Sequence, residues 1–294
     1  MTESAPAENQ QSLAHQQSTN SNRWLSENPD KAWAERFFLI YSPIWMLSMA
    51  VMMLTGWDKS WGDTALLLHG ASIALPLFLV PLLAQLIAPL IAQSSRGGGI
   101  INGIINSYWF KANLYIFIFG FFGNYVGSEY FFDVLGMVYN YPNATTTLDA
   151  TLVGNSNQPV PAIMYFYTHA YFMTYHTTAI ILLRRIMNSG IPFSALLFMP
   201  ITFAIGYCWA WVETKAMANP LMATSFYYEN MEAMLAFGSI IYATYFIGSF
   251  PIFYFIDEKP NDRWDTAKVF AAGLSASMIV FYLLEICARY IGSI

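Results

Sequence analysis

The feature that most constrains this chain is a series of long apolar stretches that charged residues rarely interrupt. A helix rises about 1.5 Å per residue and the hydrocarbon core of a bilayer is about 30 Å thick, so each crossing needs about 20 apolar residues. Hydrophobic residues make up 56% of the chain and charged residues only 11%. Seven windows are long enough, at 37–55, 65–91, 112–132, 162–183, 193–213, 234–256 and 268–291. The sequence therefore predicts an all-α, polytopic membrane helix bundle with about seven transmembrane helices.

Two windows carry a further structural signal. The second contains Pro76, Pro81 and Pro89, and proline removes a backbone donor, so we expect this span to be kinked or broken. Segment 133–161, which follows the third window, is the longest connection and contains no Lys or Arg. We expect it to cap the outer face of the bundle.

Lys and Arg predict the orientation. With a cytoplasmic N-terminus, only three of the 13 basic residues fall in outer segments, namely Lys59, Lys215 and Arg289. We interpret Arg184 and Arg185 as a positive-inside stop signal, and Lys111 as a side chain that reaches the inner headgroups. Residues 1–22 are polar and lack the order of a signal peptide, so we expect a disordered tail followed by one transmembrane helical domain over residues 23–294.

Ionisable residues inside apolar windows are candidates for function, because a charge near the centre of a span costs about 2.5–3.5 kcal/mol. Five predicted helices place an acid or an imidazole in the same outer half, at His69, Glu129, His169, Glu213 and Glu285. Glu213 and Glu285 also have simpler interpretations, as partners of Lys215 and Arg289.

One window carries two histidines, in the stretch "THAYFMTYHTTAIILLRR". His169 and His176 are seven residues apart, which is nearly two helical turns, so they lie on one face of a helix with Tyr165, Phe172 and Tyr175. Two imidazoles in such a stripe could move a proton, hold a metal or hydrogen-bond neighbouring helices.

Several function classes lack their signatures. No block of like charge indicates nucleic-acid binding, and the four histidines form none of the clusters of membrane di-iron enzymes. The chain has no glycine-rich phosphate loop and no Gly-x-Ser-x-Gly elbow. What remains is acid–base chemistry without a metal or other cofactor, or the binding and transport of an apolar ligand.

From about Trp24 to its C-terminus the chain resembles the cycloeucalenol cycloisomerase family. The resemblance lies in long ordered blocks, which include "NPDKAWAERFFLIYSPIW", "KANLYIFIFGFFGNY", "YFFDVLGMVYNYP", "THAYFMTYHTTAIILLRR", "ETKAMANP" and "YFIGSFPIFYFIDEKPNDRWD". It implies a sterol isomerase that opens the cyclopropane ring of cycloeucalenol, or of a related cyclopropyl sterol, to give obtusifoliol. An acid would protonate the cyclopropane methylene and a base would then remove a proton from an adjacent ring carbon.

These roles can be assigned to residue types. Burial disfavours the ionised form of a carboxyl group, so we expect Glu213 to be the acid, with Glu129 as the second candidate. We expect His169 to accept the proton, with His176 as a relay or second candidate, although acid and base could be exchanged. Substrate contacts are expected from Tyr165, Phe172, Tyr175, Trp209 and Asn219, whose aromatic members could face the cationic intermediate.

Two other functions compete with this one. A sterol-binding or sterol-transporting membrane protein would use the same fold without catalysis. A double-bond sterol isomerase would shift a ring alkene and leave cyclopropanes intact. In each case the chain would lie in a lipid bilayer, in the endoplasmic reticulum if the source is eukaryotic and in the inner membrane if it is bacterial. The oligomeric state and the preferred cyclopropyl sterol stay open.

Overall fold

The structure, a computed structural model, describes residues 23–92, 99–151, 153–155 and 158–294. The tail predicted at residues 1–22 lies outside this range. The helices are α2 (Pro29–Thr55), α3 (Trp57–Ser60), α4 (Asp63–Ala74), α5 (Pro76–Ala92), α6 (Ile100–Ile105), α7 (Tyr108–Phe122), α8 (Ser128–Leu135), α9 (Ile163–Met187), α10 (Ser194–Met217), α11 (Met231–Ala233), α12 (Ser239–Phe255) and α13 (Thr266–Ile291). Two π-helices, η1 (Gly123–Gly127) and η2 (Met234–Gly238), and two short strands, β1 (Met137–Tyr139) and β2 (Phe226–Tyr228), complete the elements.

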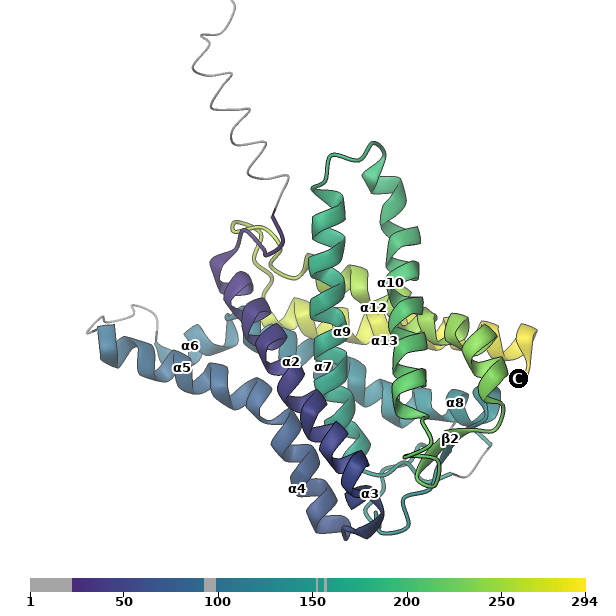
Figure 1. The fold of residues 1–294 in the computed structure, drawn as a ribbon. Coiled ribbons are helices and arrows are strands. Elements are labelled where there is room, and N and C mark those ends of the chain that lie inside the picture. Colours follow the sequence, from purple (N-terminus) through teal and green to yellow (C-terminus); the bar gives the residue numbers. More distant parts are fainter. Residues whose placement is uncertain (1–22, 93–98, 152, 156–157) are drawn as a thin grey trace, which may run out of the picture.

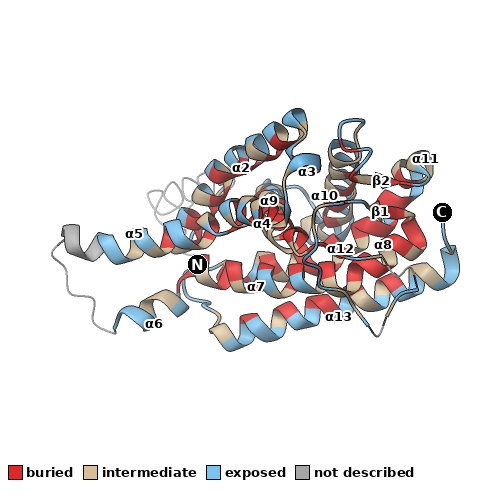
Figure 2. Cartoon of the chain, turned by 90° about the horizontal axis from the view of Figure 1, so that it is seen from below, coloured by how far each residue is buried: buried red, intermediate tan, exposed pale blue. Residues whose placement is uncertain are grey.

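The helices form two sets that cross. Helices α9 and α10 run side by side, with α2 and α4 packed against α9. Helices α7, α12 and α13 pack on one another and run across the first set (Figure 1). In Figure 2 the buried residues of α7, α9 and α12 meet where the two sets cross, whereas α5, α6 and α13 present many exposed residues. The core therefore lies at this crossing.

The predicted class, an all-α membrane protein, agrees with the helices. Within the described part of the chain, four helical stretches are long and apolar enough to cross a bilayer, namely α2, α10, Met231–Phe255 and α13. A fifth is the pair Asp63–Ala74 and Pro76–Ile87, which is bent by 47°. This break at Pro76 confirms the prediction from the prolines of that window. The predicted windows in α7–α8 and in α9 are not among these five.

Capping residues set the ends of two long helices. Asn28 precedes Pro29 at the start of α2, and its side chain accepts a hydrogen bond from the Asp30 amide. The same helix stops at Gly56, whose φ of 67° suits glycine and ends the helical geometry. Asp265 caps α13 in the same manner as Asn28, through the amide of Lys268.

The two strands tie segment 133–161 to the connection between α10 and α11. Met137 pairs with Tyr228 and Tyr139 with Phe226, in an antiparallel register. Asn140 extends the link, since its amide donates to the Ser225 carbonyl at 2.8 Å. The described part of this segment lies at one end of the helices, and its predicted position on the outer face stays a prediction.

A buried network of ion pairs joins four parts of the chain at the opposite end. Arg184, near the end of α9, donates to both carboxylate oxygens of Glu35 on α2, at 2.7 and 3.1 Å, and to both of Glu258, which follows α12. Lys31 pairs with Glu258 at 2.9 Å, and Lys111 on α7 pairs with Asp257 at 2.6 Å. Three basic and three acidic groups thus balance one another, and all of them except Glu258, which is 16% exposed, are almost completely buried.

This network corrects two interpretations of the sequence. Lys111 is 1% exposed and does not reach headgroups. Arg184 is 2% exposed and joins α9 to α2 and to the segment after α12. Only Arg185 therefore stays available as a stop signal. Its guanidinium lies 5.5 Å from the Trp24 ring centre. Burial alone would raise the pKa of Glu258, but hydrogen bonds and charges from Arg184 and Lys31 outweigh burial and hold this pKa below its ordinary value.

The substitution Arg184→Gln tests the network. It leaves Glu35 buried without its bidentate partner, so we expect a loss of about 3–5 kcal/mol in the free energy of unfolding. The measurement is the midpoint of thermal unfolding in detergent. Arg185→Gln is the matched control, with an expected loss below about 1 kcal/mol. Equal shifts for the two variants would show that the network does not hold these helices together.

Candidate functional site

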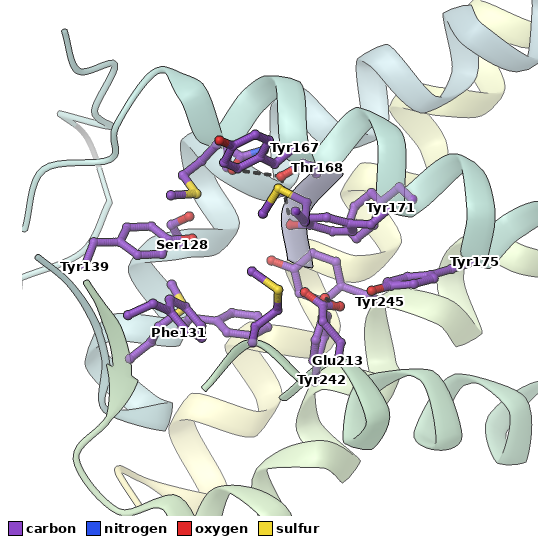
Figure 3. A pocket seen from close by; sticks show the side chains of 18 of the residues that line it. Ser128, Phe131, Tyr139, Tyr167, Thr168, Tyr171, Tyr175, Glu213, Tyr242 and Tyr245 are labelled. Carbon is purple, nitrogen blue, oxygen red and sulfur yellow. Dashed lines mark hydrogen bonds between the residues drawn. The ribbon is translucent and has the colours of Figure 1, made fainter. Parts of the chain in front are cut away.

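A cavity lined mainly by aromatic side chains lies between the helices and the strands. It has a volume of about 90 Å³. Its walls come from α2, α4, η1, α8, α9, α10, α12 and both strands. Figure 3 labels ten of the lining residues, namely Ser128, Phe131, Tyr139, Tyr167, Thr168, Tyr171, Tyr175, Glu213, Tyr242 and Tyr245. Side chains from both strands and several helices therefore meet here.

Glu213 supplies the carboxyl group of this cavity. It stands one turn before the end of α10, and the Tyr242 hydroxyl donates to its Oε2 at 2.5 Å. The Tyr175 hydroxyl is also within hydrogen-bonding reach. Since Lys215 makes no ion pair with it, the interfacial pair considered from the sequence is not formed. The arrangement holds one carboxyl group among phenols, where it can donate or accept a proton.

Tyr245 brings an unpaired hydroxyl to the cavity wall. Its ring is 2% exposed, and its Oη has no hydrogen-bond partner among the described residues. A buried hydroxyl without a partner is unfavourable, so a polar atom of a bound molecule could satisfy it.

The π-helix η1 makes room for this ring. A Cβ atom built on Gly127 would lie 1.7 Å from Tyr245 Oη, whereas one on Gly123 would lie 3.4 Å from the Phe172 ring. A π-helix inserts an extra residue into a helical turn and is frequent at functional sites. The irregular backbone and Gly127 thus let Tyr245 approach closely.

A chain of hydrogen bonds stiffens another wall. Tyr171 Oη and Thr168 Oγ1 are 2.8 Å apart, and Thr168 donates to Asn124 Oδ1 at 3.1 Å. The Asn124 amide donates in turn to the Gly120 carbonyl, so α9 is fixed to α7 and η1.

His69 joins the cavity through Tyr167. The Nδ1 atom of His69 is 2.8 Å from Tyr167 Oη, and its Nε2 is 3.0 Å from Ser48 Oγ. Tyr167 lines the cavity, and in Figure 3 it stands on a different side from Glu213. The sequence placed His69 in the outer half of its helix but gave no sign of Tyr167 as its partner, because these residues are 98 positions apart.

Three of the predicted site residues line this cavity, namely Glu213, Phe172 and Tyr175. Trp209 stands behind them, stacked on the Tyr175 ring with centres 4.4 Å apart. His169 and Tyr165 line a different space, an apolar groove between α4, α5, α7 and α9.

His176 is enclosed by protein. Its exposed fraction is 0%, its Nδ1 lies 2.8 Å from the Phe172 carbonyl, and its Nε2 lies 3.0 Å from Ser249 Oγ. Rings of α7 and α12 surround it, including Phe250 with centres 4.8 Å apart. Both ring nitrogens therefore have partners within the core, as in the simpler interpretation that a histidine hydrogen-bonds neighbouring helices.

Glu129 and Asn219 lie outside the lining of the cavity. Glu129 is buried against Gly154 of segment 133–161. Asn219 closes the end of α10, because its Nδ2 donates to the Ala216 carbonyl at 2.6 Å and its Oδ1 accepts from the Leu221 amide at 2.8 Å. No group of three His, Cys, Asp or Glu side chains able to hold a metal ion occurs in the described part of the chain.

Comparison with known proteins decides the family. The chain is 34% identical over 285 residues to cycloeucalenol cycloisomerase of Arabidopsis thaliana. The aligned region covers 94% of this chain and 92% of the plant protein. The chain belongs to the cycloeucalenol cycloisomerase family. No family model matches the sequence, and no solved structure matches it. In this member of the family, the cavity around Glu213 is the candidate active site.

The contact between Gly127 and Tyr245 yields a test of the cavity wall. We expect Gly127→Ala to destabilise the protein by about 1–3 kcal/mol, because the new methyl group overlaps the hydroxyl. Adding Tyr245→Phe should recover part of the loss, since the nearest remaining atom is then Cζ at 2.9 Å. Gly123→Ala is the control, with only ordinary contacts. Thermal unfolding in detergent measures all four proteins; no recovery in the double variant would contradict this packing.

Proposed function

We propose that this protein is a cofactor-independent sterol isomerase, which opens the cyclopropane ring of cycloeucalenol or a related cyclopropyl sterol. Membership of the family supports the reaction, and the similarity to the plant cycloeucalenol cycloisomerase supports the substrate class. The observation that carries the proposal is a carboxyl group held by a tyrosine hydroxyl inside an aromatic cavity.

The reaction is redox-neutral and needs one proton to enter and one to leave. Glu213 in its protonated form donates to the cyclopropane methylene, whose strained C–C bond breaks as the methyl group forms. Tyr242 donates to Oε2, so the other carboxyl oxygen is left to carry the proton and Tyr242 then stabilises the carboxylate. The resulting tertiary cation lies among ring faces such as those of Phe172 and Tyr171, each contributing about 0.5–2 kcal/mol.

The proton that leaves the ring needs an acceptor, and we propose Tyr167 backed by His69. As the Tyr167 oxygen takes the proton from carbon, its own proton passes to His69 Nδ1 at 2.8 Å. The earlier assignments of His169, His176 and Glu129 stay predictions, and their positions outside the cavity do not favour them.

Removing the Tyr167 hydroxyl tests this acceptor. We expect Tyr167→Phe to lower kcat at least about tenfold and to leave KM within about twofold, because the relay acts in the chemical step. Steady-state turnover in detergent gives both constants. Tyr165→Phe is the control, since its hydroxyl donates to the Leu148 carbonyl, outside the cavity. A rise in KM alone for Tyr167→Phe would assign this hydroxyl to binding.

The cavity must widen before a sterol can enter. Ligand pockets typically measure about 300–1,000 Å³, and this one measures about 90 Å³. Four of its lining residues are methionines, Met49, Met137, Met164 and Met217, whose unbranched side chains change shape at low cost. The paired strands that cover it are short, so we propose that they and these methionines move when substrate binds.

The membrane arrangement is part of the proposal. Residues 23–294 form one catalytic domain with seven spans and a cytoplasmic N-terminus, in the endoplasmic reticulum if the source is eukaryotic or the inner membrane if it is bacterial. Because the two helix sets cross, at least one set would be steeply tilted. Cysteine labelling of the connecting segments from either side of sealed vesicles tests the number of spans and the orientation.

A turnover assay with Glu213→Gln tests the proposed function. Wild-type protein in detergent should convert cycloeucalenol to obtusifoliol, as measured by gas chromatography–mass spectrometry. We expect Glu213→Gln to lose at least about 100-fold in rate, because amide cannot donate a comparable proton. The matched control is Glu232→Gln, an exposed carboxyl group on α11.

Three results would change the proposal. Wild-type protein that binds cycloeucalenol and leaves it unchanged would favour a sterol carrier. Isomerised ring alkenes with the cyclopropane intact would favour a double-bond isomerase. A loss of activity in Glu129→Gln together with normal activity in Glu213→Gln would move the acid role to Glu129.

A further inference from the structure

The apolar groove between α4, α5, α7 and α9 is larger than the cavity around Glu213. Its volume is about 420 Å³. Apolar and aromatic side chains form most of its lining, among them Phe78, Phe110, Leu114 and Phe121, and its polar side chains are those of Asn113, Tyr165 and His169. Leu75 is 47% exposed and Phe117 is 62% exposed, so the groove opens to the surroundings of the helices.

Asn113 has a fixed orientation in this groove. Pro81 has no amide hydrogen, so the Leu77 carbonyl one turn earlier lacks its helical partner. The Asn113 Nδ2 donates to this carbonyl at 3.1 Å and to the Trp109 carbonyl at 2.8 Å. A flipped amide would place its oxygen against two carbonyl oxygens, which is unfavourable. Asn113 Oδ1 therefore faces His169 as an acceptor.

The orientation of Asn113 fixes the tautomer of His169. The distance from His169 Nε2 to Asn113 Oδ1 is 2.8 Å, so Nε2 carries the hydrogen and donates it. In the neutral ring Nδ1 is then an acceptor. His169 Nδ1 has no hydrogen-bond partner among the described residues. It is also not fully buried, because the fully buried side-chain atoms without a partner do not include it. An accessible lone pair thus stands beside an apolar groove.

Such a groove matches one kind of molecule. The lining offers a large aromatic surface, one accessible acceptor on His169, and no charged side chain. A flat apolar molecule with a single hydroxyl donor and no charge matches all three features. A phospholipid chain would fill the apolar surface and leave Nδ1 without a partner.

We propose that this groove is a second sterol site, in which the sterol hydroxyl donates to His169 Nδ1 and the ring system packs on the phenylalanines of α5 and α7. The choice of a sterol among apolar alcohols rests on the proposed function. The groove is distinct from the cavity around Glu213, because the α9 residues Thr168 and Phe172 line the cavity whereas Tyr165 and His169 line the groove.

Photolabelling tests this site. Wild-type protein in nanodiscs is irradiated with a 3β-hydroxysterol that carries a diazirine in its ring system, and in parallel with the 3-O-methyl ether of the same probe. Labelled peptides are located by mass spectrometry. We expect labelling of the α4–α5 and α7 segments that line the groove, reduced about 3- to 10-fold for the methyl ether, which corresponds to one lost hydrogen bond.

Two variants make the test specific. His169→Leu should reduce labelling by the free sterol to the level of the methyl ether, provided that gel filtration shows folded protein. Glu213→Gln should label the groove like wild type even if it has lost isomerase activity, which separates this site from the proposed function.

Two results would overturn the proposal. Equal labelling by the two probes in wild-type protein would identify the groove as an ordinary lipid-facing surface. Labels confined to the residues around Glu213 would show that the groove takes no sterol.

Discussion

The rest of the structure depends on a balanced set of buried ion pairs at one end of the helices. Arg184 joins α9 to α2 and to the segment after α12, and the Lys111–Asp257 pair adds α7. Removing one member would leave a charge without a partner, so the group acts as a unit. By holding α7, α9 and α12 at this end, the network fixes where those helices meet further along, and that is where the cavity forms.

The opposite end is built in a different manner. There the helices depart from regular geometry, in η1 and η2, and short strands cover the space between them. Aromatic rings form much of the lining of the cavity here, and Glu213 is the one acidic or basic side chain in that lining. A rigid ionic end and an irregular aromatic end suit an enzyme that must hold its helices together and still admit a bulky apolar substrate.

The sequence predicted the parts of this account that depend on local patterns. Apolar windows and Pro76 predicted the helical membrane class and the broken span. An ionisable residue in an apolar window singled out Glu213, which lines the cavity and whose catalytic role stays a prediction. Partners distant in sequence were missed: Lys111 with Asp257, and His69 with Tyr167. The histidine stripe shows the limit clearly. His169 and His176 share a face of α9, yet two turns of separation bring them against different neighbours, one in an open groove and the other in a closed core.

The central claim is that a carboxylic acid in the aromatic cavity adds a proton to a cyclopropane ring and that the cation then loses another. The most direct measurement is the fate of deuterium when cycloeucalenol is turned over in deuterated water. Because a carboxyl group exchanges its proton with solvent, the account predicts obtusifoliol with one deuterium in the new angular methyl group. Obtusifoliol formed without deuterium in that methyl group, at full turnover, would contradict it.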